Sequence, residues 1–291
     1  MTKFDSIVAA TDFSDDADHA VERAAGICAA TGARGTLLHV IEFPWLDSLK
    51  RLVKLPTGMD ASIVDAAKRR VEALANELHG RTGARLEASV RTGQVVDTVL
   101  ESAAGHSLLA LGARGSHPLR DFAVGTTAER LIRRTDQPVL VVRRPAERPY
   151  QRILVAVDFS PHSRRAVECV FDLAGDAEVH LAHVFDSPLA AHMHFAGVTE
   201  EVVAELRGKE RQEAEVAMRD FIAASGVEGR VQTWIDQGDH VPSQLLARAR
   251  ELEADLVVVG KHGKSLTERL LLGSVTLHLL SEAPADVLIA Q

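Results

Sequence analysis

The sequence predicts two α/β domains, each a doubly wound, five-stranded parallel sheet with helices on both faces. Three observations support this prediction. The chain has 291 residues, enough for two domains of about 145 residues each. Its landmarks occur twice, in the same order and at nearly constant spacing. Within each half, short apolar runs alternate with longer segments of helical periodicity, which is the pattern of a parallel sheet.

The internal repeat is long enough to be a whole domain. Its matching segments are SIVAATDFS (6–14) with RILVAVDFS (152–160), LLHV (37–40) with LAHV (181–184), LLALGARG (108–115) with LVVVGKHG (256–263), and QPVLVV (137–142) with ADVLIA (285–290). Only the loop lengths differ between the two copies. We therefore predict two related domains, 1–145 and 146–291, joined by a short proline-containing linker.

The apolar runs of the first half have the length and branched side chains of buried strands. Strands are expected near residues 6–10, 35–40, 85–90, 108–111 and 138–142. Ser14 is the expected N-cap of the first helix, and Gly32 stands where a left-handed C-terminal cap is expected. In the second half, Ser160 and Pro161 repeat this helix start.

Composition and charge exclude several classes of protein. Hydrophobic residues make up 46% and charged residues 25%, which is typical of globular domains. Lys plus Arg against Asp plus Glu is 19 against 18 in residues 1–145, and 14 against 23 in the remainder. An acidic second half lacks the cationic face that a nucleic acid requires, so no nucleic-acid partner is expected.

Neither the membrane nor an oxidising compartment is indicated. No window approaches 18 consecutive apolar residues, and the first residues lack a basic-then-apolar signal pattern. The two cysteines, Cys28 and Cys169, fall in helical patterns outside any C-x-x-C pair, which favours buried free thiols. We therefore expect no membrane partner and a cytoplasmic location.

The strongest functional signal follows the fourth expected strand of each half. Residues 112–126 and 260–274 share the spacing G-x2-G-x9-G-[ST]. Glycine lets the backbone approach a sugar or phosphate closely, and the last glycine opens a helix whose N-terminus favours an anion. The alternative is that these glycines only form turns and caps. A Walker loop is not indicated, because Val258 stands where that motif requires glycine.

Other residues each leave two interpretations open. Asp12 and Asp158 follow the first strand of each half, at the edge where open parallel sheets bind ligands, but they also suit the turn before a helix. His192 and His194 form an H-x-H pattern in an expected loop, and without an evident third ligand no metal site is predicted. Residues 43–58 fit a lid, a partner surface or an ordinary packed helix.

These motifs resemble the ATP-binding branch of the universal stress protein family, over essentially the whole chain and twice. The shared features are D-F-S after the first strand, H-V at the end of the second, and G-x2-G-x9-G-[ST] before a V-L-V-V-type strand. The resemblance implies Rossmann-like domains of the adenine nucleotide α-hydrolase type. It also implies a stress-response role, with ATP as ligand, with or without Mg²⁺, and ADP or AMP as alternatives.

The resemblance also implies roles for particular residues. The aspartates would reach the adenine or ribose, valines at the end of the second strand would present main chain to the adenine, and the glycine loops would take ribose and phosphates. The residues so assigned are Asp12, Val40, Gly112, Gly115, Gly125 and Thr126 in the first half, and Asp158, Val184, Gly260, Gly263, Gly273 and Ser274 in the second. The second loop is the closer match, since the first has Arg114 in place of His262 and Thr127 in place of Val275.

The function indicated is a nucleotide-binding regulatory module and not an enzyme, because the sequence shows no acid–base pair, metal-carboxylate cluster or nucleophile beside the glycine loop. Two alternatives stay open: a slow ATPase or nucleotide-transferring enzyme using the same cleft, and an interaction protein with one or both sites vestigial. The expected partners are an adenine nucleotide and an unidentified protein. By resemblance, segments 138–142 and 286–290 would meet, making the chain a covalent mimic of a homodimer that is open to further dimerisation.

Overall fold

The computed structural model describes residues 4–42, 59–115, 125–238, 240–263 and 272–291. It contains two compact units, an N-terminal unit of residues 2–149 and a C-terminal unit of residues 150–291, and each is described by itself. The apolar and basic segment 43–58, expected to be a lid, a partner surface or a helix, lies outside the described residues.

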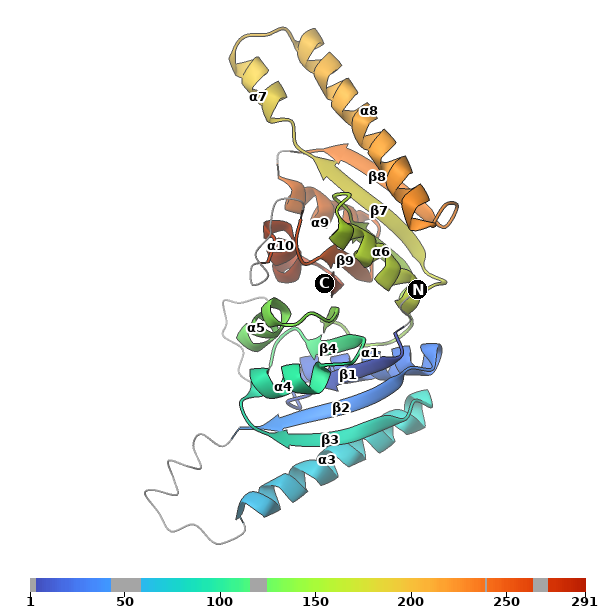
Figure 1. Ribbon diagram of the computed structural model, residues 1–291, viewed down its shortest axis with the longest axis vertical. Helices are drawn as coiled ribbons and strands as arrows, with labels where there is room; N and C mark the ends of the chain where they lie inside the picture. Colours follow the sequence, from blue (N-terminus) through green and yellow to red (C-terminus); the bar gives the residue numbers. More distant parts are fainter. Residues whose placement is uncertain (1–3, 43–58, 116–124, 239, 264–271) are drawn as a thin grey trace, which may run out of the picture. The chain divides into compact units, whose positions relative to one another are not determined.

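The N-terminal unit is a parallel sheet with the strand order β3-β2-β1-β4-β5 (Figure 1). Its strands are β1 Ser6–Ala10, β2 Arg34–Ile41, β3 Leu86–Thr92, β4 Leu108–Gly112 and β5 Val139–Val142. Its helices are α1 Asp15–Thr31, α3 Met59–Thr82, α4 Val95–Ala103 and α5 Thr126–Arg134. In the central register, Ile7 of β1 lies between Gly35 of β2 and Leu108 of β4.

The C-terminal unit repeats this arrangement with the order β8-β7-β6-β9-β10, again all parallel. Its strands are β6 Arg152–Ala156, β7 Glu178–Phe185, β8 Val231–Gln237, β9 Leu256–Gly260 and β10 Asp286–Ala290. Its helices are α6 Pro161–Leu173, α7 Pro188–Phe195, α8 Glu200–Ser225, α9 Val241–Glu251 and α10 Ser274–Glu282. The predicted α/β class, with five parallel strands in each half, is confirmed.

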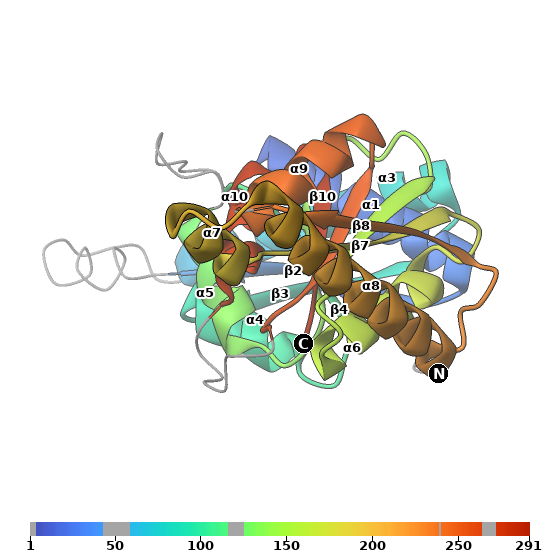
Figure 2. The same ribbon diagram turned by 90° about the horizontal axis from the view of Figure 1, so that it is seen from above.

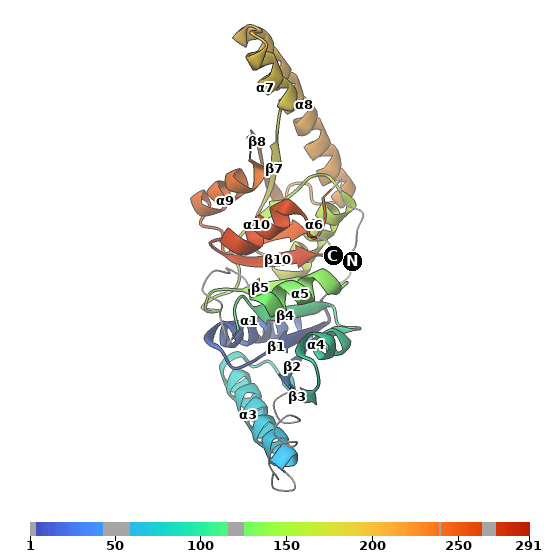
Figure 3. The same cartoon turned by 90° about the vertical axis from the view of Figure 1, so that its left-hand side faces the viewer.

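The winding of each sheet reverses beside its first strand. In the N-terminal unit the chain moves from β1 to β2 and β3 in one direction, then returns to add β4 and β5 on the other side of β1. Because parallel crossovers are right-handed, this reversal places α1 and α3 on one face and α4 and α5 on the other. Helix α1 contacts α3, and α4 contacts α5, and Figure 3 shows α1 and α4 on opposite sides of the strands.

The expected helix ends are confirmed. The Ser14 hydroxyl caps α1 by accepting from the amide of Ala17, and Gly32 ends this helix with a left-handed φ of 75°. Ser160 caps α6, with Pro161 in its first turn. These local signals fix where each helix leaves the sheet, and with it the position of the loop between strand and helix.

One expected loop is a helix instead. Residues 188–195, where the H-x-H pattern lies, form α7, which contacts α8 and runs beside it (Figure 2). The Nδ1 atom of His192 is 2.6 Å from the carbonyl oxygen of Pro188, one turn earlier. Among the described residues no group of three His, Cys, Asp or Glu side chains could hold a metal ion.

The two cysteines are buried free thiols, as predicted. Burial raises the pKa of the Cys28 thiol to about 11 and that of the Cys169 thiol to about 12. Both side chains therefore stay protonated at neutral pH and act as small apolar groups in α1 and α6. Within the described parts of the chain, no helix has the length and hydropathy needed to cross a membrane.

Candidate functional site

Each unit carries a cavity at the carboxyl edge of its sheet, beside the point where the winding reverses. The N-terminal cavity has a volume of about 350 Å³ and the C-terminal cavity about 420 Å³. Both volumes fall in the range of small-molecule sites. Each cavity is lined by residues from the ends of three strands, from the loop after the fourth strand and from the start of the helix that follows.

The structure brings all twelve residues singled out in the sequence to these two cavities. The N-terminal cavity is lined by Asp12, Val40, Gly112, Gly115, Gly125 and Thr126. The C-terminal cavity is lined by Asp158, Val184, Gly260, Gly263, Gly273 and Ser274. These residues come from segments up to about a hundred positions apart, so their convergence follows from the fold and not from any local pattern.

Each aspartate is held by a tight turn at the end of the first strand. In the N-terminal unit the carboxylate oxygen Oδ1 of Asp12 accepts hydrogen bonds from the amide (3.1 Å) and hydroxyl (2.6 Å) of Ser14. In the C-terminal unit Oδ1 of Asp158 accepts from the amide of Ser160 (3.0 Å) and the hydroxyl of Ser163 (2.5 Å). Both carboxylates are therefore oriented before any ligand arrives.

A phenylalanine in left-handed backbone geometry follows each aspartate. The φ angle is 61° at Phe13 and 64° at Phe159. A bulky side chain rarely adopts this conformation, which costs about 1–3 kcal/mol, so the surroundings must stabilise it. Each ring contacts a histidine of the second strand, at a centroid distance of 4.6 Å to His39 and 4.3 Å to His183.

These two histidines also hold the end of the first strand. Nδ1 of His39 lies 2.8 Å from the carbonyl oxygen of Thr11, and Nδ1 of His183 lies 2.8 Å from that of Val157. A carbonyl oxygen only accepts, so both rings carry a proton on Nδ1 and donate it. Both histidines therefore have a structural role. The sequence signal for this contact is that D-F-S and H-V each occur in both halves, so the phenylalanine and the histidine are repeated together.

The first glycine of each loop is required by packing against a helix. A Cβ on Gly112 would lie 2.6 Å from the main-chain carbon of Asp16 and 2.7 Å from the amide nitrogen of Ala17. A Cβ on Gly260 would lie 2.8 Å from the Cβ of His162. The sequence interpretation tied these glycines to a tight bend and close ligand approach, but contact with the first turn of α1 or α6 already excludes a side chain.

The second glycine of each loop lies against the aspartate. A Cβ on Gly115 would be 2.8 Å from Oδ2 of Asp12, and one on Gly263 would be 3.1 Å from Oδ2 of Asp158. None of the loop glycines has a positive φ, so left-handed geometry is not what requires them. A side chain at either position would press on the carboxylate, more closely at Gly115 than at Gly263.

The third glycine opens the last helix and leaves room in front of it. Gly125 precedes α5 and Gly273 precedes α10, both with extended backbone and neither with a side-chain cap. Among the described residues, a Cβ at these positions would meet only ordinary contacts, at 3.6 Å and 3.5 Å or longer. The first N–H groups of each helix, which have no partner within the helix, therefore lie beside an open space with a partial positive potential.

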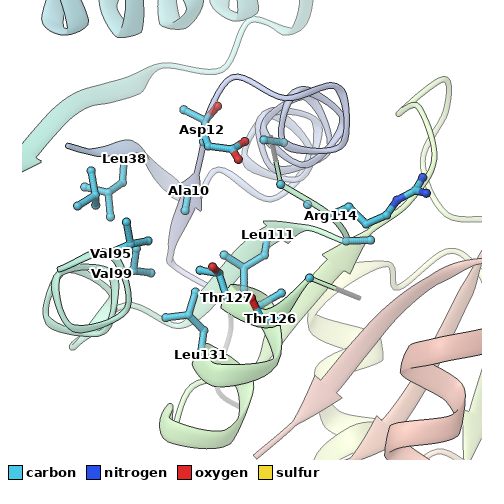
Figure 4. A pocket seen from close by; sticks show the side chains of 18 residues that line it. Ala10, Asp12, Leu38, Val95, Val99, Leu111, Arg114, Thr126, Thr127 and Leu131 are labelled. Carbon is cyan, nitrogen blue, oxygen red and sulfur yellow. The ribbon is translucent and has the colours of Figure 1, made fainter. Parts of the chain in front are cut away.

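An apolar wall completes each cavity and was not recognised in the sequence. Val95 and Val99 of α4 line the N-terminal cavity, and Val241 and Leu245 of α9 line the C-terminal one. Figure 4 shows Asp12 on one side of the N-terminal cavity, Val95 and Val99 on another, and Thr126 and Thr127 at the start of α5. The sequence signal for this wall is a pair of apolar residues four positions apart at the start of the helix that follows the third strand.

The two loops differ in charge at both positions between their first two glycines, which are Ala113 and Arg114 in the first loop and Lys261 and His262 in the second. The amide and Nε of Arg114 both donate to Oδ2 of Asp16, at 3.0 Å and 3.2 Å, and its side chain points away from the cavity in Figure 4. The corresponding residues of the C-terminal unit are His262 and His162, whose rings lie 5.3 Å apart at 78°. Burial lowers the pKa of His262, and the nearby His162 and Lys261 lower it further.

Comparisons with known proteins match both halves of the chain. The model of the universal stress protein family matches residues 3–143 and again residues 149–291. A universal stress protein of Mycobacterium tuberculosis is 28% identical over 213 residues, which cover 72% of this chain and 66% of that protein. One from Mycolicibacterium smegmatis is 25% identical over 305 residues, covering 98% of this chain and 96% of that protein.

A solved structure shares the fold over essentially the whole chain. The crystal structure of a universal stress protein from Archaeoglobus fulgidus has a TM-score of 0.71 at 20% identity, covering 99% of this chain and 98% of that one. A universal stress protein solved in complex with cAMP is 23% identical, with a TM-score of 0.37, and covers 49% of this chain and 99% of that one. The family model accounts for each half of the sequence separately. The chain therefore belongs to the universal stress protein family and contains two of its domains in tandem.

Proposed function

We propose that each half of the chain binds an adenine nucleotide, ATP foremost, and that occupancy of the two sites is the regulatory signal in a stress response. One observation carries the proposal: a fixed carboxylate and a helix N-terminus face the same cavity, and this pairing occurs in both units. A nucleotide has ribose hydroxyls that can donate to a carboxylate and phosphates that suit the N-terminus of a helix.

Simpler ligands account for only part of each cavity. A free anion would find the helix N-terminus favourable but the carboxylate of Asp12 or Asp158 repulsive. A cation would be attracted by the carboxylate and repelled by the helix N-terminus. The apolar wall made by Val95 and Val99 gives a flat base a surface on which to bury area, which neither ion requires. A ligand with an apolar base, a hydroxylated sugar and an anionic tail uses all three features.

The cavities hold the parts of a binding site and few parts of a catalytic one. Within the described residues no cluster of carboxylates and histidines could hold a metal ion, although the phosphates of a nucleotide could themselves bring Mg²⁺. Amide groups and a hydroxyl at the start of α5 or α10 bind phosphate without activating an attacking water. Binding of this kind fills the site with nucleotide but does not accelerate its hydrolysis.

The decisive experiment is identification of the nucleotide that leaves the purified protein on denaturation. Mass spectrometry should detect an adenine nucleotide, and calorimetry on the stripped protein should show two sites per chain. Protein that elutes without nucleotide and gives no heat with ATP, ADP or AMP would contradict the proposal and favour an interaction protein with vestigial sites.

A further inference from the structure

The helix that forms the apolar wall begins differently in the two units. In the N-terminal unit, Glu42 lies just beyond the end of β2, and its Oε1 accepts a hydrogen bond of 2.5 Å from the amide of Val95, the first residue of α4. Glu42 is half-buried and is not among the described residues that line the cavity. The carboxylate at the end of this strand is therefore used by the protein itself, because the first amides of a helix need an acceptor.

In the C-terminal unit, helix α9 has a cap of its own. The Nδ1 atom of His240 accepts from the amide of Ser243 and lies 2.7 Å from the hydroxyl of the same residue. Pro242, in the first turn of α9, has no amide hydrogen to satisfy. The start of α9 therefore needs less from a carboxylate than the start of α4 does.

Asp186 is the counterpart of Glu42, and it faces the cavity instead of the helix. It lies one residue after β7, as Glu42 lies one residue after β2, and it lines the C-terminal cavity. Asp186 is exposed and has no hydrogen-bond or ion-pair partner among the described residues. Aspartate is also one methylene shorter than glutamate, so it reaches less far toward the helix. The C-terminal cavity thus has a second carboxylate whose oxygens are available to a ligand.

The two carboxylates of this cavity stand at different parts of it. Asp186 lies on the same side of the chain as Val184, which also lines the cavity, because residues two apart in an extended chain point to the same side. Strand β7, from which both emerge, contacts α9, the helix that supplies the apolar wall. Oδ2 of Asp158, by contrast, lies 3.1 Å from where a Cβ on Gly263 would be, beside the glycine loop. A base packed on the apolar wall would therefore turn its polar edge toward Asp186 and its sugar toward Asp158.

We propose that Asp186 determines base specificity at the C-terminal site by accepting a hydrogen bond from the exocyclic amino group of adenine. This inference rests on the proposed function. An ionised carboxylate only accepts, so it attracts an amino group and repels the carbonyl oxygen that hypoxanthine carries at the same position. In the N-terminal unit the carboxylate of Glu42 is bound to α4, so that site lacks this contact. The C-terminal site therefore distinguishes amino from oxo purines more strongly than the N-terminal site does.

The test compares ATP with inosine triphosphate (ITP), which has the same sugar and phosphates and differs in the base alone. Calorimetry is run on full-length protein carrying Gly125→Val, which leaves the C-terminal site, and on protein carrying Gly273→Val, which leaves the N-terminal site. The preference for ATP over ITP should be about tenfold greater at the C-terminal site, the scale of one hydrogen bond to a charged group. Adding Asp186→Asn should remove this excess, because an asparagine amide can accept from one base and donate to the other.

A matched control and a second measurement separate base recognition from charge and from folding. Asp176→Asn makes the same change of charge two residues before β7, at an exposed position outside the described lining of the cavity, and should leave the ATP-to-ITP ratio unchanged. Where a blocking glycine variant does not fold, the otherwise unmodified chain is titrated with and without Asp186→Asn, and only one of its two sites should change its ratio.

Two kinds of failure are distinguishable. Equal ATP-to-ITP ratios at the two sites, or an unchanged ratio in Asp186→Asn, would overturn this inference alone. Absence of any adenine nucleotide binding to the unmodified chain would overturn the proposed function, and this inference with it.

Discussion

In the N-terminal unit the amide and the hydroxyl of Ser14 both donate to Asp12, whereas in the C-terminal unit Asp158 takes its hydroxyl donor from Ser163, one turn into α6. Ala17 occupies the corresponding position in α1. The turn, the left-handed phenylalanine and the histidine beneath it are the same in both units. The backbone frame is thus shared between the two copies, while the side chains that hold the carboxylate have diverged.

The loop glycines give a second contrast, between positions fixed by packing and positions that face open space. Gly112 lies too close to the main chain of Asp16 to accept a side chain, while a Cβ on Gly125 would meet only ordinary contacts among the described residues. A glycine that the protein itself does not require is the better indicator of a ligand. Substitution of these glycines tests whether the two kinds of position differ in this way.

The largest effect is expected from Gly125→Val and Gly273→Val. Each side chain would project into the space in front of α5 or α10 and should lower ATP affinity at its own site at least about a hundredfold, with little change in stability. Calorimetry with ATP on each single variant measures this, and the untouched site of the same chain is the internal control. Undiminished affinity at the altered site would remove the third glycine from the binding site.

Gly112→Ala should instead act on folding. The new Cβ would press on the main chain of Asp16 and Ala17, and we expect a loss of about 2–3 kcal/mol in the free energy of unfolding of the N-terminal unit. Urea denaturation followed by circular dichroism gives this value, with Gly125→Ala as the matched control, which should stay within about 1 kcal/mol of the parent. Equal stability of the two variants would mean that the loop moves aside.

Ser163→Ala separates the two ways of holding the carboxylate. The Ser163 hydroxyl donates to Oδ1 of Asp158 and accepts from its amide, so its loss should cost about 1–3 kcal/mol of stability and weaken ligand binding in the C-terminal unit. Ser14→Ala removes an exposed hydrogen bond and a helix cap and should cost about 1 kcal/mol. Thermal unfolding and ATP titration of both variants test the order; a greater loss in Ser14→Ala would reverse it.

Ser274→Ala should have a smaller effect, confined to the ligand. It removes one hydroxyl at the start of α10, and we expect about 1 kcal/mol of binding energy to be lost, or roughly fivefold in affinity. Calorimetry with ATP checks this, and Thr126→Ala is the equivalent change in the other unit. No loss in either variant would assign phosphate binding to the main chain alone.

The smallest signal is expected in the rate of ATP hydrolysis by the unmodified protein. With Mg²⁺ and ATP, either site should hydrolyse far less than about one ATP per second, because no cluster of side chains that could hold a metal ion occurs among the described residues. A coupled phosphate assay on purified protein measures this. Faster turnover that disappears in Asp158→Ala would identify a catalytic carboxylate and support the enzymatic alternative.

Much of this architecture is predictable from the sequence because its signals are local. Strand positions, the caps at Ser14 and Ser160 and the left-handed Gly32 depend on a few neighbouring residues, and the repeat provides each signal twice. The left-handed Phe13 is different, since its conformation depends on a ring from another strand. The sequence predicts a loop at α7 because its eight residues show no amphipathic pattern, whereas in the structure they form a helix in contact with α8.

For the cavities, the order of motifs in the sequence predicts which residues line them, but not why each residue type is required at its position. All twelve assigned positions line a cavity, because the carboxyl ends of adjacent parallel strands must meet at one edge. The packing role of Gly112 and Gly260 was not visible, since it depends on how closely β4 and β9 approach the helices on their flank. Distances of this kind are set by tertiary packing, which no short motif encodes.

Each cavity takes its described lining residues from its own unit. If both cavities bind the nucleotide as proposed, one polypeptide carries two sites that are always present in equal number, however much protein the cell makes. If their affinities differ, they fill one after the other as the ligand concentration rises, and each chain passes through empty, singly filled and doubly filled states. Such a molecule reports concentration in steps over a wider range than one site covers, and a partner that recognises only the doubly filled state would respond to the upper step alone.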